Sequence, residues 1–486
     1  MTIPIHAPRW LTPVTAAFAG SLLLSLVARL GSTINRDGML YIHTAQAFLD
    51  GGFAAAKEIF TWPFLSIGIA IVSKLTGLGL ENAGYLLNAL FMAGACALMV
   101  ACTARRSPAL AWWACLTVLA LPGFNEYRNE LLREFGCWFF VMLACWLALR
   151  WEEQPRWPGA LAIQLAVMAA ALFRPEAVAI FPALLAWQLF SAPRGQRARN
   201  LAMVSLLPLI GCAIVAALFM AGKLGADNRI AADLGRVSTA RFDAKADVLA
   251  SGLIEYARGQ ARTILLFGSL ALIPVKLLQK FGIFLLPLAG FLVAGDVRAA
   301  VRRHAFFVWG IAAHLCVLAI FVIDLQFLAG RYVGLILLLA TPFVAAGLQW
   351  GSQRFRHANA ITIVLCLVLA AGNVISTGAG KAHHVEAGKW LANSGTDVAK
   401  VYIDSGRTAY HAGWAKVPIA ARNNRAEIEH AATSRRYEFF VLEISRKDPP
   451  WESWLRDTGL QVVQRFEIPN GDAVVVAIPR EKESRQ

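Results

Sequence analysis

The sequence has little charge for its length. Only 16% of its 486 residues are Asp, Glu, Lys or Arg, whereas 57% are hydrophobic and the mean hydropathy is +0.54. A soluble chain of this composition would lack the polar surface that is needed to cover its core. Apolar runs of about 20 residues, the length of a membrane-crossing helix, recur from Leu11 almost to Thr377. The scarcity of charge therefore predicts an integral membrane protein built from helices.

Patterns for metal binding and for disulfides are also missing. The eight cysteines all fall in apolar runs and none forms a CxxC pair, so we interpret them as small core residues. The nine histidines form no HExxH motif. The net charge is +15, but the arginines gather in short gaps between apolar runs, such as "TARRS" and "DVRAAVRRH". This is the positive-inside pattern of membrane proteins, and it argues against a nucleic-acid partner.

Placing the arginine-rich gaps in the cytoplasm predicts about eleven spans in a cell inner membrane, with a cytoplasmic N-terminus. The expected spans are 11–30, 82–103, 109–122, 135–149, 158–173, 176–190, 201–221, 282–295, 304–323, 332–349 and 359–376. Two longer segments, 31–81 and 222–264, then lie outside. The first contains an amphipathic helix from Gly38 to Phe48 and a semi-apolar run, Trp62 to Gly79, that could lie on the surface or span.

From Gly378 the composition becomes that of a soluble domain, which gives a transmembrane part, 1–377, and an outer or periplasmic domain, 378–486. The strand candidates "KVYID", "KVPIA", "YEFFVLEI", "QVVQRFEI" and "DAVVVAI" are interspersed with helical patterns, which predicts a small α/β domain. Pro469-Asn470-Gly471-Asp472 is a hairpin turn signal between the last two strands. The fold class is therefore a polytopic helical membrane protein with a C-terminal α/β domain.

Four charged breaks fall on the outer side of this topology. They are Arg36-Asp37, "NEYRNELLREFG", "FRPEA" and "FLAGRY". A charge at membrane depth is costly unless it is paired or functional, and one outward-facing polar cavity would explain all four breaks together. In the second break, Glu130 and Glu134 stand at i and i+4 with Arg133 between them. They could form a structural ion network, or they could bind a metal or a phosphate.

The third break allows similar alternatives. Pro175 follows Arg174 in the tight crossing between two spans. Glu176 can cap the N-terminus of the next helix, where a negative charge is favourable. Arg174 can reach a lipid phosphate or extend its guanidinium to the membrane interface.

The order of these motifs resembles the multi-pass C-type (GT-C) glycosyltransferases, in the branch of protein O-mannosyltransferases and the lipid A aminoarabinose transferase. There an acidic motif, D-[EG]-x-x-Y-x-x-x-A, follows the first span, and "DGMLYIHTA" from Asp37 matches it. "ALMVACTARR", "NEYRNELLREFGCWFF", "LFRPEAVAIFPALLAW" and "GRYVGLILLLATPFVAAGL" follow in the family's order. The chain departs from the pattern at Gly38, where a second acidic residue is common. It also lacks a lysine at Thr61-Trp62, for which Lys57 is the nearest substitute.

The resemblance implies transfer of a sugar from a polyprenyl-phosphate donor to a lipid, glycan or protein acceptor on the outer face, with inversion. It implies that Asp37 is the general base and that Glu126 is a second carboxylate that orients the acceptor or a metal. No cofactor is certain, and a divalent cation held by Asp37 and Glu126 stays open. The cationic candidates for stabilising the leaving phosphate are Arg128, Arg133, Arg174 and Arg331. The other candidates for substrate binding are Arg36, Tyr41, Lys57, Glu130, Glu134, Glu176 and Tyr332.

Two other functions fit an outer-face membrane protein. A transporter or flippase of lipid-linked saccharides would typically show internal repeats and charges near the midplane. The sequence shows no repeat between its halves, and its charges gather at one face. An O-antigen polymerase or ligase would be expected to have a dominant central outer loop and no soluble C-terminal domain. Both alternatives stay open.

Overall fold

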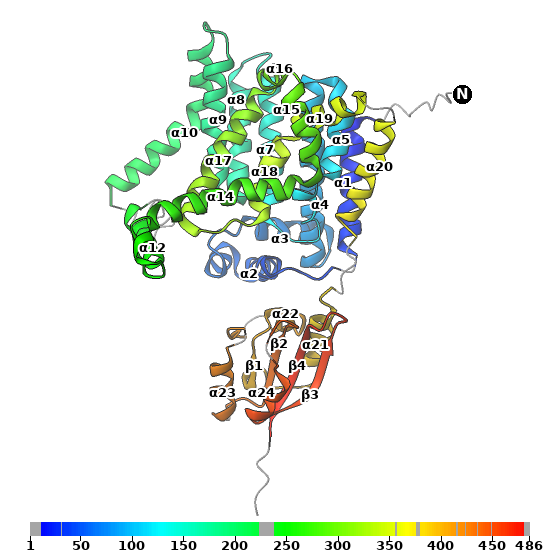
Figure 1. The fold of residues 1–486 in the computed structure, drawn as a ribbon, viewed down its shortest axis with the longest axis vertical. Coiled ribbons are helices and arrows are strands. Elements are labelled where there is room, and N and C mark those ends of the chain that lie inside the picture. The colour runs from blue at the N-terminus through cyan, green and yellow to red at the C-terminus, as the bar shows by residue number, and fades with distance from the viewer. Residues whose placement is uncertain are drawn as a thin grey trace, which may run out of the picture. The chain divides into compact units, whose positions relative to one another are not determined.

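The computed structural model describes residues 11–30, 32–222, 238–354, 357–375, 380–414, 417–422, 424–434, 436–448 and 450–480 (Figure 1). The chain divides into two compact units. The first comprises Met1–Val27, Leu86–Arg128 and Leu132–Val374. The second comprises Ala28–Tyr85, Asn129–Leu131 and Ile375–Gln486.

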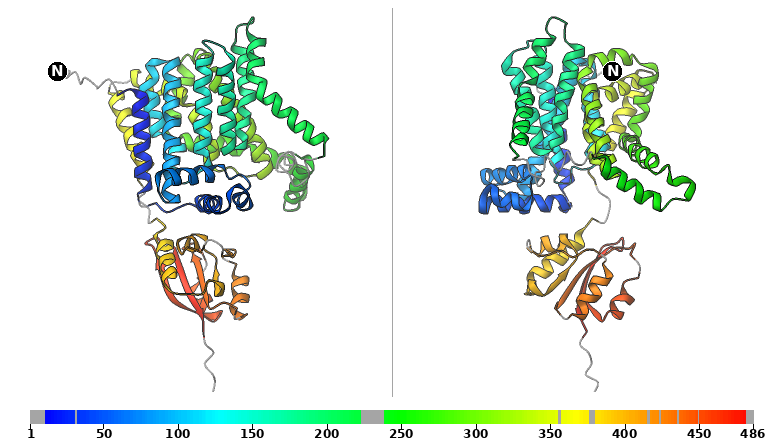
Figure 2. Two further views of the ribbon diagram at one scale, coloured as in Figure 1. Left: turned by 180° about the vertical axis from the view of Figure 1, so that it is seen from behind. Right: turned by 90° about the vertical axis from the view of Figure 1, so that its left-hand side faces the viewer.

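The first unit consists of helices, and Figure 2 shows most of the long ones running side by side. With most of α1 and α4, its elements are α1 (Pro13–Arg29), α4 (Leu80–Arg106), η1 (Pro108–Leu110), α5 (Ala111–Ala120), α6 (Pro122–Asn125), α7 (Arg133–Trp151), α8 (Trp157–Phe173), η2 (Pro175–Ala179), α9 (Ile180–Ser191), α10 (Arg197–Met220), α12 (Thr239–Ser251), α13 (Glu255–Arg258), α14 (Ala261–Phe281), η3 (Gly282–Phe284), α15 (Leu285–Ala294), α16 (Val297–Arg303), α17 (Ala305–Leu325), η4 (Gly330–Val333), α18 (Gly334–Leu339), α19 (Thr341–Arg354) and α20 (Ala358–Gly372).

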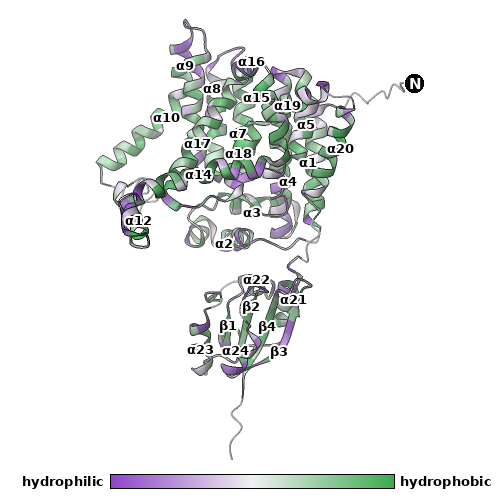
Figure 3. Ribbon diagram, viewed as in Figure 1, coloured by the Kyte–Doolittle hydropathy of each residue, from purple (hydrophilic) through white to green (hydrophobic). Residues whose placement is uncertain are grey.

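Apolar helices account for the expected spans. In the part of the chain that the structure describes, five helices are long and apolar enough to cross a membrane, and a sixth span results if the pair Gly330–Leu339 and Thr341–Arg354, bent by 65°, counts as one. Shorter apolar helices cover the remaining expected spans, and Figure 3 shows that most of the first unit is hydrophobic. The class of a helical multi-pass membrane protein is therefore confirmed.

Helix α14 (Ala261–Phe281) overlaps the end of the expected outer segment 222–264. Helix α14 begins at Ala261, inside that segment, and continues to Phe281 through residues that the sequence left unassigned. Arg262, Lys276 and Lys280 interrupt its apolar pattern, but the continuous helical stretch Ala261–Ala294 is long and apolar enough to count as a membrane span. In Figure 1, α14 crosses the direction of the neighbouring long helices. It brings a lysine, Lys280, to the polar part of the first unit.

The second unit contains two helices from the N-terminal third of the chain. Helix α2 (Arg36–Ile59) includes the expected amphipathic stretch, with Tyr41 and Ala45 buried, and it is kinked at Gly52, where φ is 70°. Helix α3 (Phe64–Thr76) has 13 residues. At 1.5 Å per residue it measures about 20 Å, which is too short to cross about 30 Å of hydrocarbon alone. The surface alternative for Trp62 to Gly79 fits this length.

The rest of the second unit is an α/β domain with a mixed sheet of order β1-β2-β4-β3. Strands β1 and β2 are parallel, and the other pairs are antiparallel. The elements are α21 (Ala382–Asn393), η5 (Val398–Lys400), β1 (Val401–Ile403), α22 (Gly406–His411), α23 (Arg425–Thr433), β2 (Phe439–Ile444), α24 (Glu452–Asp457), β3 (Leu460–Glu467) and β4 (Ala473–Pro479).

Side chains that alternate along β2 and β4 form two cores, one on each face of the sheet. Phe440 and Val475 belong to one core, and Val441 and Val474 belong to the other. The predicted hairpin turn before β4 is confirmed, with Gly471 at a φ of 88°. The prediction of a strand at "KVPIA" is wrong for its described residues, 417–420, because Pro418 cannot donate a ladder hydrogen bond.

Candidate active site in the helical unit

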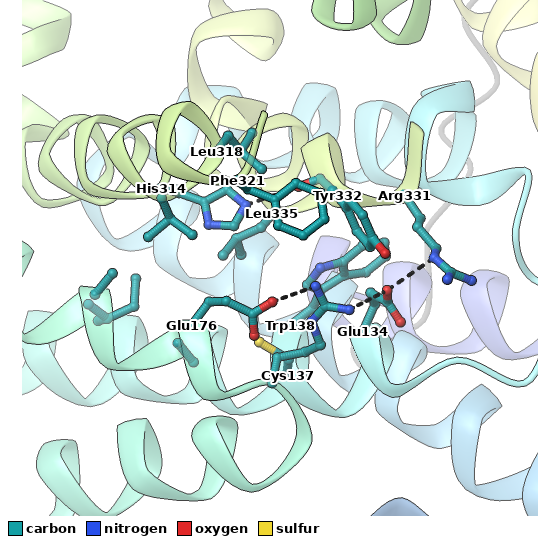
Figure 4. A pocket seen from close by; sticks show the side chains of 15 residues that line it. Glu134, Cys137, Trp138, Glu176, His314, Leu318, Phe321, Arg331, Tyr332 and Leu335 are labelled. Atoms are coloured by element: carbon teal, nitrogen blue, oxygen red, sulfur yellow. Dashed lines mark hydrogen bonds and ion pairs between the residues drawn. The ribbon is translucent and has the colours of Figure 1, made fainter. Parts of the chain in front are cut away.

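A cavity opens in the first unit between α7, η2, α17, η4 and α18. Its walls are mostly apolar, with Trp138, Leu318, Phe321 and Leu335 among the lining residues. Charged side chains enter it from three elements that are far apart in the sequence (Figure 4). A cavity that joins apolar walls to a charged end suits an amphiphilic ligand.

Two arginines and two glutamates form the charged end of this cavity. The Arg174 guanidinium bridges the two carboxylates, with Nη1 lying 3.1 Å from Glu134 Oε1 and Nη2 lying 2.6 Å from Glu176 Oε1. Arg331 Nε lies 3.3 Å from the same Glu134 oxygen. The side chains of Glu134 and Arg174 are only 6% and 16% exposed. The sequence predicted these four residues as substrate-binding candidates, and the structure brings them together.

Aromatic and backbone groups hold the arginines in place. The Arg174 guanidinium lies 4.8 Å from the centre of the Tyr332 ring, and that of Arg331 lies 5.5 Å from it. His314 Nε2 lies 3.0 Å from the Tyr332 carbonyl oxygen. Cation–π contacts and hydrogen bonds of this kind restrict the side chains that they involve. The cluster is thus preorganised.

Local sequence explains why Glu134 and Arg174 meet. Glu134 stands in the first turn of α7, where the helix dipole favours a carboxylate. Arg174 ends α8, because the following Pro175 begins η2 and leaves its predecessor extended. A Cβ on Gly136 would lie 2.4 Å from the Phe173 ring, so only glycine lets α7 and α8 approach this closely. The two charged residues therefore lie at one end of a tightly packed helix pair.

A second ion pair joins Glu126 to Lys280. Sequence reasoning identified Glu126 as a candidate but missed Lys280. The Lys280 ammonium also lies 5.4 Å from the centre of the Tyr127 ring. Helix α14, which carries Lys280, packs against η4, which carries Arg331. The sequence feature that could have identified Lys280 is its position at the end of the apolar run "LLFGSLALIPVKLLQK". Because α14 was not recognised as an element, that lysine was not connected with the site.

Arg128 has a different environment from the one expected of a phosphate ligand. It is 4% exposed, and it donates to Asn125 Oδ1, to the Ser21 carbonyl and to the hydroxyls of Ser21 and Ser25, all at 2.8 to 2.9 Å. These bonds attach the loop after α6 to α1. The structure thus favours Arg128 as a positioning residue. Arg133 precedes Glu134 in the sequence. It is the first residue of α7, and its side chain is half-buried.

The remaining candidates belong to the second unit. Asp37 is half-buried in the first turn of α2, and Arg36 before it is exposed. The Asn35 side chain accepts from Leu131 N at 3.0 Å and donates to the Leu131 carbonyl at 3.3 Å, which attaches the start of α2 to residues 129–131. That segment contains Glu130. Tyr41 is buried in α2, whereas Lys57 is exposed in the last turn of this helix.

The packing explains why glycine follows Asp37. A Cβ on Gly38 would lie 2.6 Å from Asn35 Oδ1, 2.9 Å from Ile34 Cγ1 and 3.1 Å from Leu131 Cβ. A second acidic side chain at this position would displace the Asn35–Leu131 hydrogen bonds. The departure from the family motif at position 38 therefore matches the local geometry of this chain.

Within the described residues, no group of three or more His, Cys, Asp or Glu side chains is placed to hold a metal ion. Asp37 and Glu126, the two expected candidates, belong to different units. The divalent cation thus stays a prediction of the sequence.

Comparison with known proteins gives matches in structure only. No protein family and no curated protein matches the sequence. The structure is similar to ArnT from Cupriavidus metallidurans bound to undecaprenyl phosphate, with a TM-score of 0.56 and 13% identity over 95% of this chain and 97% of that one. It is also similar to the Archaeoglobus fulgidus oligosaccharyltransferase, with a TM-score of 0.54 and 13% identity over 88% of this chain and 69% of that one.

The chain has the GT-C fold. The resemblance in motif order is thereby confirmed at the level of the fold, because the apo form of ArnT from the same organism also matches over 95% of the chain, with a TM-score of 0.52. Identities of 12 to 13% show a common architecture and do not transfer any residue's role. The roles of the GT-C residues in this chain therefore depend on its own geometry.

Proposed function

We propose that this protein is a glycosyltransferase that moves a sugar from a polyprenyl-phosphate donor to a lipid, glycan or protein acceptor on the outer face of the membrane. The observation that carries the proposal is the convergence of Arg174 and Arg331 on Glu134 at the charged end of an apolar cavity in a GT-C fold. Such a cavity offers cations for a phosphate and apolar walls for a prenyl chain.

The cations would act on the leaving group. When the bond between the anomeric carbon and the phosphate oxygen breaks, the lipid phosphate departs with the electron pair. Donors that are held in advance near this developing charge lower the barrier. Arg331 and Lys280 come from adjacent elements, and each contacts a carboxylate that a phosphate could replace in part.

Asp37 would act on the acceptor. Its carboxylate takes the proton of the acceptor hydroxyl while the oxygen attacks the anomeric carbon from the face opposite to the phosphate, which inverts the configuration. The first turn of α2 is tied to residues 129–131 by Asn35, and Gly38 permits that close approach. The carboxylate is thus attached to a packed segment and not to a free loop. Glu126 would orient the acceptor or a cation.

The test is transfer of radiolabelled sugar from a panel of polyprenyl-phosphate sugars to membrane extracts. Asp37→Asn is compared with the unchanged protein at matched expression. Asp50→Asn is the control, since Asp50 lies on the exposed side of the same helix and accepts a hydrogen bond only from Gln46 among the described residues. We expect transfer by the unchanged protein and by Asp50→Asn, and its loss in Asp37→Asn. Undiminished transfer by Asp37→Asn would eliminate Asp37 as the base.

A further inference from the structure

Helix α17 carries a single basic residue, His314, in the middle of an apolar run. The helix is long and apolar enough to cross a membrane, and His314 lines the cavity from it (Figure 4). A polar side chain in such a helix is costly unless it has a partner or a function. His314 falls in none of the four charged breaks of the sequence, so only the structure connects it with the site.

The partner of His314 is a backbone carbonyl group. Its Nε2 lies 3.0 Å from the Tyr332 oxygen. Because a carbonyl oxygen can only accept, Nε2 carries the hydrogen and donates it. Tyr332 belongs to η4, a 3₁₀ turn of four residues, and the hydrogen bonds within such turns have poorer geometry than those of an α-helix. A hydrogen bond from a neighbouring helix therefore helps to fix the position of η4.

Helix α17 contacts Tyr332 a second time, through Phe321. The Phe321 ring centre lies 5.0 Å from that of Tyr332, with an angle of 81° between the rings. Aromatic rings attract each other in this edge-to-face arrangement. His314 and Phe321 are seven residues apart, which places them on the same side of the helix. One side of α17 therefore holds both the backbone and the ring of Tyr332.

Close packing at both ends leaves η4 little room. A Cβ on Gly330, directly before Arg331, would lie 2.9 Å from Lys280 Nζ. A Cβ on Gly334, directly after η4, would lie 2.7 Å from Trp138 Cη2. Interiors that are packed this closely transmit small displacements. A shift of η4 would therefore disturb its contacts with the other walls of the cavity.

We propose that His314 is a positioning residue, which holds η4 so that Arg331 and Tyr332 stay where they bind the phosphate of the donor. The donor phosphate rests on the proposed glycosyltransferase function. Arg331 Nε lies 3.3 Å from Glu134 Oε1, and the Tyr332 ring centre lies 4.8 Å from the Arg174 guanidinium. Both contacts come from the turn whose carbonyl His314 holds. Binding and charge stabilisation depend steeply on such placement, so loss of this hydrogen bond weakens phosphate binding.

The experiment uses the full-length protein in detergent, without any sugar. Calorimetry measures binding of undecaprenyl phosphate, and hydrogen exchange of the amides of residues 329–335 reports the mobility of η4. His314→Leu removes the donor, whereas His314→Gln keeps one, because the Gln amide can donate in place of the imidazole Nε2. Cys316→Leu is the matched control, since Cys316 is exposed on the same helix. Cooperative thermal unfolding shows that each variant is folded, and His314→Met replaces His314→Leu if that variant does not fold.

We expect His314→Leu to bind undecaprenyl phosphate about tenfold more weakly and to exchange faster in η4, as the loss of one hydrogen bond predicts. His314→Gln and Cys316→Leu should stay within about threefold of the unchanged protein. A residue that acts through Arg331 has no further effect once Arg331 is lost. His314→Leu should therefore weaken binding no further in an Arg331→Gln background.

Three results would overturn the inference. They are unchanged binding by folded His314→Leu, an equal loss in His314→Gln, and the same loss with and without Arg331. No binding by the unchanged protein would overturn both this inference and the proposed function. Normal binding of undecaprenyl phosphate without transfer of sugar from any donor would contradict the proposed function alone, so the two failures are distinguishable.

Discussion

At the scale of single residues, burial decides how much an ion pair contributes. The pair of Arg174 and Glu134 is nearly buried, whereas Glu153, the partner of Arg105, is 62% exposed. Removing one member of a buried pair leaves a charge without compensation, while exposed pairs are screened by water. The two arginines should therefore respond differently to the same substitution.

We predict that Arg174→Gln destabilises the protein by about 3 kcal/mol and that Arg105→Gln costs about 0.5 kcal/mol. Loss of Arg174 removes the ion pairs with Glu176 and Glu134, and Glu134 keeps its contact with Arg331. Unfolding of the purified protein in detergent, followed by intrinsic fluorescence, measures both changes. Similar costs for the two variants would mean that the cavity cluster is as well hydrated as the surface pair.

A second residue-scale prediction concerns Gly38. Gly38→Ala should destabilise the start of α2 by about 1 to 3 kcal/mol, because the added Cβ overlaps Asn35 and Leu131. Gly79→Ala is the control, since nothing lies within 4 Å of a Cβ at that position. Protection from proteolysis within residues 32–50 reports the effect directly. Equal protection in both variants would show that Asn35 can move away at little cost.

At the scale of elements, the packing of α21 on α22 predicts a pH dependence. Burial is the largest cause that lowers the pKa of His384, followed by the charges of His383 and Arg407, and the pKa falls from 6.5 to about 2. The unfolded chain therefore binds a proton below pH 6.5 that the folded domain does not bind. The stability contributed by neutral His384 is present above pH 6.5 and is lost as the pH falls below it.

For one such histidine the loss reaches about 2 kcal/mol at pH 5, and the lowered pKa values of His383 and His411 add to it. The measurement is the free energy of unfolding of the C-terminal domain within the full-length protein, between pH 7.5 and pH 5. His384→Asn should flatten the profile, whereas His430→Asn on the exposed side of α23 should not. A flat profile in the unchanged protein would contradict the burial of a neutral imidazole.

Periodicity and turn chemistry predicted most of the elements. Apolar runs identified helices such as α7 and α17, and the Asn470-Gly471 turn identified the β3–β4 hairpin, because these signals are local. The prediction failed where the environment outweighs the local pattern. "KVPIA" is apolar enough for a strand, but Pro418 lacks a donor. Helix α14 is apolar enough to be a span although three basic residues interrupt it, and it packs against α17 and η4.

At the scale of the whole molecule, the candidate site depends on contacts that the sequence does not contain. The charged breaks suggested Glu134, Arg174, Glu176 and Arg331 as candidates, but not which cation faces which carboxylate. Arg128 carried the same signal and is engaged in hydrogen bonds to α1. Residue type and the expected side of the membrane identify candidate site residues. Only tertiary packing distinguishes a residue that lines a cavity from one that supports a loop.

At this scale we predict that the protein catalyses sugar transfer and does not only move a lipid-linked sugar across the membrane. The most direct measurement follows a labelled sugar, supplied as its polyprenyl phosphate, in vesicles that contain the purified protein and an acceptor extract. We expect the label to become covalently attached to the acceptor, with release of an equal amount of polyprenyl phosphate, and both to disappear in Asp37→Asn. Label that crosses the bilayer while still attached to its lipid, with no transfer to acceptor, would contradict the account and establish a transporter.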